Sequence, residues 1–409
     1  MSVDASFLRI PIRNLFRQRT RTLASLCAIS VGVACLIIAG GFVKDILFQL
    51  GEATIHSQTG HVQISSPAYW QTNNRSASAP AITNINEIKS LIASLESIDH
   101  LAARMNFVGM LNNGKRDLGV IGEGIEADQE AAIGSFLHFF EGRALQDSDQ
   151  DGIVIGHGVA RVLDVKVGDY VTLVATLAEG ALNTSEFKVI GIFQSFSKEF
   201  DSRAVRIPLR AAGELIDSKE PHLLVLTLKE TQDTNSFLEK VTPKLAGFGV
   251  VAKSWVELSD FYEKTVHLYD AQFGVLRLIV FLMVLLSVAN SINMSLYERT
   301  REFGTALALG SHPRTVFRQI LVESLMLGVA GSALGATMAL VVSWGLSFHG
   351  IPMPPPPNAN IGYLARIRLD STSVLISVVI GIVSTIFAAI LPARRASRLP
   401  IIDALRHGV

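Results

Sequence analysis

The segment "YERTREFGTALALGSHPRTVFRQ" at 297–319 lies between two long apolar runs and holds the residues best suited to chemistry at a protein surface. Charges of both signs come first, and small residues then recur at every second position. Small residues let another surface approach closely. The charged residues are Glu298, Arg299, Arg301 and Glu302, and the small ones are Gly304, Ala306, Ala308 and Gly310. The segment predicts a docking surface; charges that only anchor the chain at a membrane face are the alternative.

No catalytic motif accompanies this segment. The sequence contains no G-x-x-x-x-G-K-[ST], so the chain cannot cradle nucleotide phosphates in the manner of a P-loop. It also lacks H-E-x-x-H, Cys-x-x-Cys and G-x-S-x-G, and its ten histidines are scattered. We therefore predict that the chain is not an enzyme, that it binds no cofactor or metal itself, and that nucleic acid is not a partner.

The elements that must position the docking segment are membrane helices. A chain with 18% charged residues and a mean hydropathy of +0.37 is too apolar for an ordinary soluble protein. A helix that crosses the hydrocarbon core needs about 20 mostly apolar residues. Four segments meet that length, and we place the transmembrane helices at 22–46, 271–297, 319–348 and 371–393.

Basic residues set the expected orientation, because Lys and Arg beside membrane spans favour the cytoplasmic side. Arginines cluster before the first span, between the second and third spans, and after the fourth. If the chain crosses the membrane four times, these clusters all lie on the same side of it. Arg366 and Arg368 would lie on the opposite side, but they are fewer. We expect a bacterial inner-membrane protein with a cytoplasmic amphipathic entry helix at 1–21, a cytoplasmic coupling helix at 298–318 and a cytoplasmic tail at 394–409. On the other side we expect a periplasmic domain at 47–270 and a proline-rich outer loop at 349–370.

The outer domain shows two patterns along its length. Strand, helix and strand patterns follow one another near its start, and the same order returns near its end with "LLVLTL", "NSFLEKVTPKL" and "VVAKSWVEL". Between them, at about 112–215, short β-rich runs alternate with turn residues. The predicted fold is an α-helical membrane protein with four transmembrane helices and a large extracytoplasmic α+β domain, in which two βαβ-like halves enclose a β-rich insertion.

Several smaller features are further candidates. The pair Gly331 and Gly335 would let two helices pack closely. Glu323 could pair with Arg318 or Arg301, or reach the headgroups as an interfacial carboxylate. Two exposed segments could contact a substrate or partner, the first through Tyr69 and Trp70 and the second through Pro354, Pro355, Pro356 and Pro357. A mobile tail and a rigid turn, respectively, would explain the same residues.

Three stretches carry a resemblance to a known family. "ERTREFGTALALGSHPRTVFRQILVESLMLGVAGSALG", the N-terminal "IRNLFRQRTRTLASLCAISVGVA" and the C-terminal "LPARRASRLPIIDAL" are similar to segments of the MacB/FtsX-like permeases, the type VII ABC transporters. The resemblance implies mechanotransmission, in which a cytoplasmic ABC ATPase dimer, with its own ATP and Mg, moves the helices and the outer domain. It assigns coupling to the ATPase to Glu298, Arg299, Arg301, Glu302, Gly304, Ala308, Leu309 and Gly310.

Within that family the architecture most resembles the lipoprotein-releasing permeases of the LolC/LolE type. The resemblance implies a second permease subunit, identical or related, and release of lipoproteins or lipids from the inner membrane. A lipid-anchored substrate or a periplasmic adaptor would be a further partner. The alternatives are an efflux permease for a peptide, drug or siderophore with an adaptor protein, and a cell-division-type regulator of a wall hydrolase.

Overall fold

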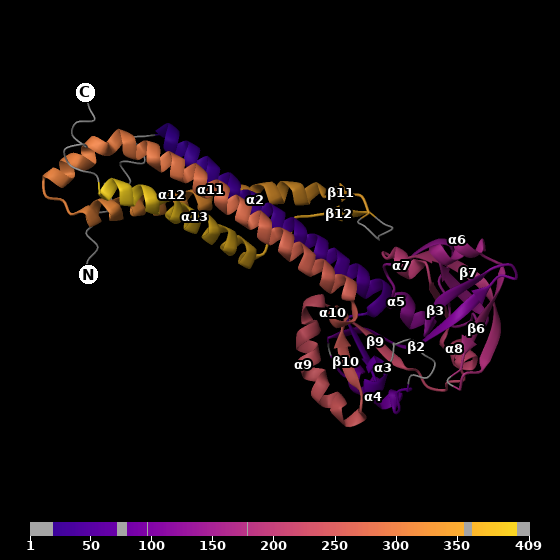
Figure 1. Ribbon diagram of the computed structural model, residues 1–409. Coiled ribbons are helices and arrows are strands. Elements are labelled where there is room, and N and C mark those ends of the chain that lie inside the picture. Colours follow the sequence, from indigo (N-terminus) through magenta and orange to yellow (C-terminus); the bar gives the residue numbers. More distant parts are fainter. Residues whose placement is uncertain (1–18, 72–79, 96, 178, 356–361, 399–409) are drawn as a thin grey trace. The chain divides into compact units, whose positions relative to one another are not determined.

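The computed structural model describes residues 19–71, 80–95, 97–177, 179–355 and 362–398 (Figure 1). The described chain divides into two compact units. The helical bundle comprises the described residues up to Leu47 together with Val266–Pro352 and those from Leu364 onward. The globular domain comprises the described residues of Phe48–Thr265 and Met353–Tyr363. The division falls inside two long helices, so each of them contributes residues to both units.

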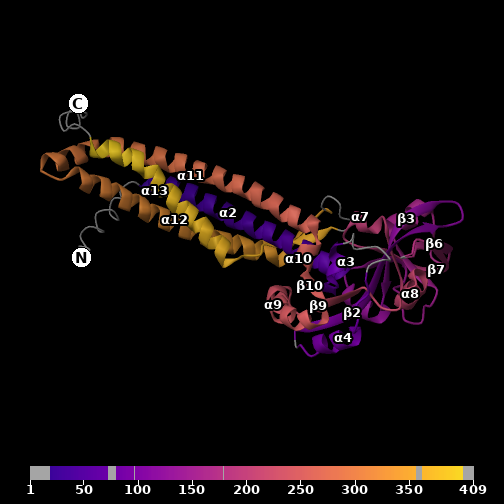
Figure 2. The ribbon, with the colours of Figure 1, turned by 60° about the horizontal axis from the view of Figure 1, so that its bottom comes forward.

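The bundle is built from long apolar helices that lie side by side (Figures 1 and 2). Within the described residues, four helices are long and apolar enough to cross a membrane, which is the number predicted. Valine and isoleucine side chains from α2 and α11 form much of the shared core, with alanines of α12 and α13. The helices are α2 (Arg19–Thr54), α11 (Asp260–Ala308), α12 (Pro313–His349) and α13 (Ser371–Ser397).

Polar contacts join α2 to the segment that precedes α13. Asp45 is 4% exposed and accepts a hydrogen bond from the Arg366 backbone N–H at 2.8 Å, while Arg368 Nε lies 4.0 Å from its carboxylate. Lys44 Nζ lies 2.9 Å from the Asp370 carboxylate. The two arginines that dissented from the charge pattern therefore lie beside a buried carboxylate.

The globular domain is a mixed α/β structure. Its strands are β1 (Val62–Ser65), β2 (Ile98–Asn112), β3 (Asp117–Ile125), β4 (His138–Gly142), β5 (Gly152–Gly156), β6 (Tyr170–Thr176), β7 (Leu182–Gln194), β8 (Ala204–Pro208), β9 (Leu223–Leu228) and β10 (Val251–Ser254). Its helices are α3 (Pro67–Gln71), α4 (Ile85–Ala93), α5 (Ala127–Ile133), α6 (His157–Leu163), α7 (Lys198–Asp201), α8 (Leu209–Ile216), α9 (Thr234–Leu245) and α10 (Trp255–Leu258), and α2 ends in a π-helical turn at Ile55–Thr59.

The two βαβ-like halves are interleaved in one sheet. In the order β10-β1-β9-β2, β1 is antiparallel to β9 and β10, and β9 is antiparallel to β2. Helices α4 and α9 make the two crossovers, which gives the ferredoxin-like arrangement of a split βαβ pair. Their apolar residues recur every three or four positions and face one core with β1 and β9. The predicted fold class is confirmed.

The β-rich segment predicted at 112–215 extends this sheet instead of forming a separate one. Strand β2 is 15 residues long, and its first part pairs with β9 while the rest pairs with β3 and β6. Strands β8, β5, β7 and β4 continue beyond β3. A second core of Val, Ile, Leu and Phe side chains lies on this part of the sheet. Only 106–111 of β2 shows a plain apolar pattern in the sequence, so its full length is not apparent from the sequence alone.

Candidate functional site

The docking segment forms a tight corner between α11 and α12. Helix α11 runs without a break to Ala308, where the Ser311 N–H donates to the Ala306 carbonyl and the Gly310 N–H to the Leu307 carbonyl. This is a Schellman ending, and Gly310 takes the positive φ of 93° that it requires. Helix α12 then begins with Pro313 in its first turn and His312 as its cap. The separate coupling helix expected at 298–318 is therefore not present, because nothing in the sequence stops α11 before Gly310.

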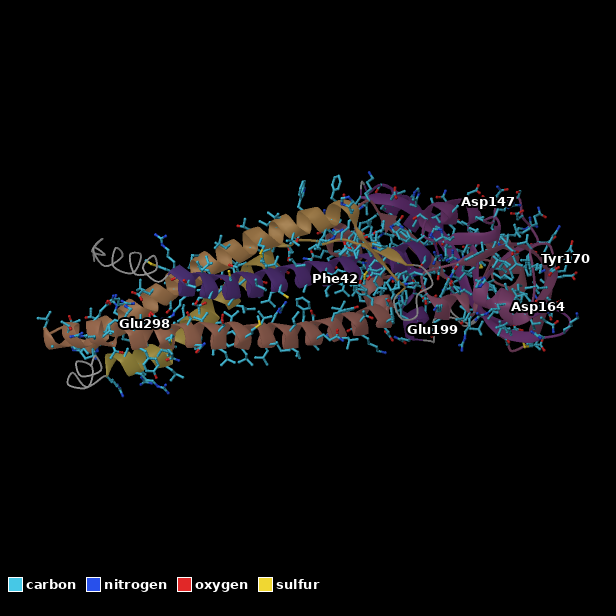
Figure 3. All side chains as sticks on the ribbon, turned by 90° about the horizontal axis from the view of Figure 1, so that it is seen from above. Phe42, Asp147, Asp164, Tyr170, Glu199 and Glu298 are labelled. Carbon is cyan, nitrogen blue, oxygen red and sulfur yellow. The ribbon has the colours of Figure 1, made fainter. Side chains whose placement is uncertain are left out.

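Most of the predicted coupling residues are exposed on this corner. Leu309 is 83% exposed, and Glu298, labelled in Figure 3, is also on the surface. Arg301, Glu302, Ala308 and Gly310 are exposed as well. Gly304 is buried beside Phe303, whose ring packs with residues of α12 and α13. The corner therefore presents an exposed leucine among charges of both signs, while Gly304 belongs to its packed side.

Arg299 holds the corner together from within. Its side chain is 12% exposed, and Nη1 lies 2.9 Å from the Glu323 carboxylate on α12. Nε lies 3.4 Å from Glu302, and the guanidinium stands 4.9 Å from the centre of the Phe303 ring. Arg299 lies on the face of α11 that packs on α12, whereas Arg301 is exposed. The predicted pairing of Glu323 with Arg318 or Arg301 stays a prediction.

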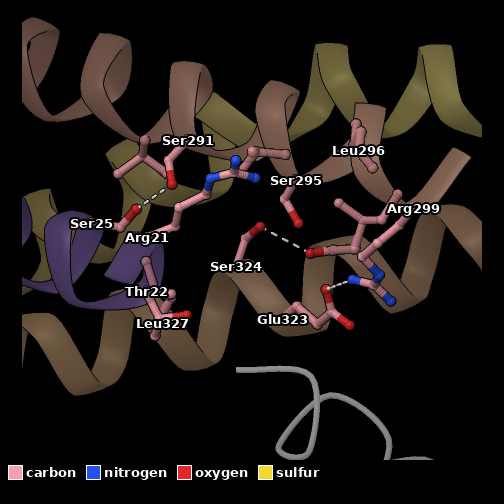
Figure 4. Close-up of a pocket in the computed structure, with 13 residues that line it drawn as sticks. Arg21, Thr22, Ser25, Ser291, Ser295, Leu296, Arg299, Glu323, Ser324 and Leu327 are labelled. Atoms are coloured by element: carbon pink, nitrogen blue, oxygen red, sulfur yellow. Dashed lines mark hydrogen bonds and ion pairs between the residues drawn. The ribbon is translucent and has the colours of Figure 1, made fainter. Parts of the chain in front are cut away.

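A small cavity of about 70 Å³, lined by both polar and apolar side chains, lies beside this ion pair (Figure 4). Serines from three helices line it, and Ser25 Oγ of α2 donates to Ser291 Oγ of α11 at 2.7 Å. Arg21 of α2 lines the same cavity and pairs with Glu298. Three helices thus meet at the corner through hydrogen bonds and ion pairs, which sequence spacing could not specify.

The glycine pair of α12 lies directly against α2. A methyl group at Gly331 would come within 2.8 Å of Ile29, and one at Gly335 within 2.6 Å of the Ser30 carbonyl oxygen. Ser30 Oγ also donates to the Gly331 carbonyl at 2.9 Å. The two glycines let the helix backbones approach closely.

We expect the Gly335→Leu variant to destabilise the bundle by about 1–3 kcal/mol, because backbone atoms of Ser30 cannot move aside for a side chain. Gly345 is the matched control, since it lies on the same helix with no atom within 4 Å of an added methyl group. Thermal unfolding of the full chain in mild detergent should show a lower midpoint for Gly335→Leu than for Gly345→Leu. Equal midpoints would contradict the close helix contact.

In the globular domain, two buried arginines hold the end of α2. Arg104 pairs with Glu130 and donates from Nη1 to the Gln58 carbonyl; each of these two charged side chains is 2% exposed. Arg206 donates to Glu123 at 2.7 Å and to the Ser57 carbonyl at 3.0 Å. Burial alone would raise the pKa of Glu130, but the two arginines hold it below its usual value. The π-helical turn that ends α2 is therefore fixed by a buried ionic network.

The start of α11 is fixed in the same domain. Trp255 and Tyr262 contact each other with ring centres 4.5 Å apart. A methyl group at Gly51 of α2 would come within 2.7 Å of the Trp255 ring, so the indole packs against that helix. Ser254 and Glu257 form a capping box just before α11. Residues of both long helices therefore pack within the globular domain.

A series of side-chain hydrogen bonds links His61 to α2 in the same domain. His61 is 1% exposed, and its Nδ1 accepts from the Leu228 N–H at 3.1 Å, so Nε2 carries the proton of the neutral ring. Nε2 donates to Thr231 Oγ1 at 2.9 Å, and Thr231 donates to Glu52 of α2. Burial first, and His56 second, lower the pKa of His61 to about 4.

The globular domain should therefore lose stability as the pH falls. A histidine has a pKa of about 6.5 in the unfolded chain. Between pH 6.5 and 4 the unfolded state binds more protons than the folded one, so protonation favours unfolding. The free energy of unfolding is therefore highest above pH 6.5 and falls as the pH drops below that value. At pH 5 the loss from His61 is about 2 kcal/mol, or roughly 4–8 °C in the unfolding midpoint. Thermal unfolding at pH 5 and 7.5 tests this, and His61→Gln should reduce the difference; an unchanged pH dependence would contradict it.

The remaining candidates have mixed outcomes. Tyr69 is 1% exposed and accepts a hydrogen bond from Asn106 at 3.0 Å, so its predicted surface role is wrong: α3 packs it against β9. Trp70 is half-buried, with Lys253 Nζ 4.9 Å from its ring centre. Pro354 and Pro355 are exposed beside β11 (Ile351–Met353), which pairs with β12 (Tyr363–Ala365). The predictions for Pro356 and Pro357 lie outside the described residues.

Neither unit offers a metal centre within the described chain, where no group of three or more His, Cys, Asp or Glu side chains could hold an ion.

Two family models and several known proteins match this sequence. The family model of the MacB-like periplasmic core domain matches residues 22–244, more than half of the 409 residues, and that of the FtsX-like permease C-terminal region matches 274–401. The chain is 22% identical to the lipoprotein-releasing system transmembrane protein LolC of Neisseria meningitidis, across 99% of this chain and 98% of that protein. It is 19% identical to LolE of Haemophilus influenzae, across 92% and 91%. The pyoverdine export ATP-binding/permease protein PvdT of Pseudomonas entomophila is 28% identical across 54% of this chain but only 33% of PvdT.

Proposed function

Since the chain belongs to the family of the MacB-like periplasmic core domain, with an FtsX-like permease C-terminal region, we propose that it releases lipid-anchored proteins from the inner membrane. It is an ABC transporter permease of the MacB, FtsX and LolC type. Similarity to LolC and LolE along nearly the whole chain supports lipoproteins as the cargo, whereas the similarity to PvdT covers a third of that protein.

We infer that the energy comes from an ABC ATPase subunit that binds ATP and Mg²⁺, since these 409 residues contain no P-loop motif that could bind the nucleotide. The single observation that carries this proposal is the α11–α12 corner, where the exposed Leu309 lies among charged side chains and Arg299 fixes the two helices. An apolar anchor surrounded by charges suits a protein interface. The corner and both chain ends are cytoplasmic, the globular domain is periplasmic, and a second permease subunit completes the membrane part.

Movement at the corner can reach the globular domain through the chain itself. Helix α11 runs from Asp260 to Ala308 without a proline, so a displacement of its end is passed along a stiff element. The ionic network around Arg104 and Arg206 holds the end of α2, and Trp255 packs on the same helix. The chain therefore transmits movement and carries out no chemical step.

Affinity purification of the tagged full-length chain in mild detergent, followed by mass spectrometry of bound proteins, tests the proposal. We expect an ABC ATPase and a protein with an acylated N-terminal cysteine. Glu302→Lys should reduce the recovered ATPase at least tenfold, because it reverses a charge on the corner. The control Glu239→Lys changes an exposed glutamate on α9 and should leave the recovery unchanged. Recovery of an adaptor with an unacylated peptide or small molecule would contradict lipoprotein release.

A further inference from the structure

A second, mostly apolar cavity of about 220 Å³ lies within the globular domain. Helix α5 and strands β4, β5, β7 and β8 contribute to its walls. The side chains of Phe139, Leu145, Val154 and Phe193 make the walls apolar, and Ala131 lies on its exposed rim. At its base are two charged side chains, Glu130 and Arg206, each 2% exposed.

Arg206 has one nitrogen left for a ligand. Nε donates to Glu123 and Nη2 to the Ser57 carbonyl, while Nη1 lies 3.7 Å from Glu130, beyond hydrogen-bond distance. Nη1 donates to no residue of the described chain, although it lies next to Gly134, which also lines the cavity. Nη1 is thus open to the cavity that Arg206 lines, and a molecule that brings an acceptor oxygen there can accept its hydrogen bond in place of water.

The charged side chains at the bottom of the cavity determine whether a charged or an uncharged acceptor can bind there. Two arginines, Arg104 and Arg206, face two carboxylates, Glu123 and Glu130, so the buried network is already neutral. A ligand carboxylate would add a buried negative charge with no counterion of its own. A carbonyl or hydroxyl oxygen would accept from Nη1 without disturbing that balance.

We propose that this cavity binds a small, uncharged molecule with one aromatic or branched aliphatic group and one acceptor oxygen, which accepts a hydrogen bond from Arg206 Nη1. The volume agrees with that size, since an apolar protein cavity of about 150 Å³ holds benzene. A ring with one carbonyl group fits a cavity of about 220 Å³. This site goes beyond the proposed function and does not depend on the cargo or the ATPase.

The position of the site gives it a consequence for α2. The guanidinium that would hold the ligand also holds the Ser57 carbonyl in the π-helical turn that ends α2. A ligand that draws Nη1 toward the cavity therefore acts on the same side chain that anchors the helix. Binding should change amide hydrogen exchange at Ile55–Gly60 and leave the exchange of α9, which is not in contact with the cavity, unchanged.

Fluorine NMR of 4-fluorobenzamide with the full chain in lipid nanodiscs tests the site. Empty nanodiscs correct for partition of the probe into lipid. Ala131→Trp should weaken binding at least tenfold, because its side chain would fill the mouth of the cavity. Ala132→Trp is the matched control, since Ala132 is the next residue of α5, is exposed and does not line the cavity. Equal binding by both variants, or none to the wild type, would overturn the proposal.

The preference of the cavity for an uncharged ligand is tested in the same experiment. The isosteric anion 4-fluorobenzoate should bind at least tenfold more weakly than 4-fluorobenzamide, because its charge would be uncompensated. If the two probes bind equally, or the anion binds better, the assignment of a neutral ligand is wrong. These measurements use no ATPase and no lipoprotein, so their failure would be distinct from failure of the proposed function.

Discussion

Replacing Arg104 with methionine is expected to lower the free energy of unfolding of the globular domain by about 3–5 kcal/mol, because it leaves a buried carboxylate without its main partner. Glu130 would keep only Arg206, whose Nη1 is 3.7 Å away. The Gln58 carbonyl would also lose the hydrogen bond that Arg104 donates. The substitution should therefore weaken both the domain and its hold on the end of α2.

Denaturant unfolding of the full chain in mild detergent measures this effect. Lys89→Met is the control, because it removes a half-exposed ion pair with Glu126 in the same domain and should cost less than about 1 kcal/mol. The double variant Arg104→Met with Glu130→Leu should recover part of the loss, since no unpaired charge remains. If Arg104→Met costs no more than Lys89→Met, the buried network does not hold the domain as described.

Leu309→Asp is expected to abolish association with the ATPase, with a loss of at least tenfold. Leu309 is 83% exposed and follows the last residue of α11, so the change should leave the fold of the chain intact. A carboxylate in place of an apolar anchor would have to be desolvated in the interface, which is costly. Release of lipid-anchored protein should fall by a similar factor, because the energy source would be lost.

The ATPase that remains on washed membranes, measured by quantitative mass spectrometry, reports this loss. Leu182→Asp is the matched control, because Leu182 is 70% exposed on β7 and lies far along the chain from the corner. The control should retain wild-type association. Normal association of the Leu309→Asp chain would show that the exposed leucine is not part of the interface.

The membrane helices and the fold class could be predicted because their signals are local. Apolar runs of sufficient length specify spans, and the repeated strand-helix-strand pattern specified the two halves of the domain. The residue at which α11 ends was not predicted from such local signals. Charged and small residues suggested a separate coupling helix, but only Gly310 has the local conformation that stops a helix.

The buried ionic network that holds the end of α2 could not be predicted, because its residues are far apart in sequence. Arg104, Glu123, Glu130 and Arg206 come from three strands and a helix that meet only after the sheet has formed. A signal was nevertheless present: Arg104 and Arg206 each lie within a strongly apolar strand, in "AARMNF" and "AVRIPL". A lone arginine in such a run faces the interior and needs a buried carboxylate.

Tyr69 was predicted to be exposed, but it is buried. The polar residues that follow it suggested an exposed loop, so its ring was assigned to partner contact. Tyrosine is, however, largely apolar, and the short helix α3 places it against Leu223 and Val225 of β9 with its hydroxyl paired to Asn106. Composition of a neighbouring segment therefore does not determine the burial of an aromatic side chain.

The most direct test of the central claim is photocrosslinking from the α11–α12 corner in living cells. A photoreactive phenylalanine analogue at position 309 should crosslink the chain to an ABC ATPase, and the same analogue at position 182 should not. Mass spectrometry of the crosslinked band would identify the partner. Crosslinks to an ATPase from position 309 alone are the predicted result. Crosslinks from position 309 only to lipid or to periplasmic proteins would contradict the claim that this corner docks the ATPase.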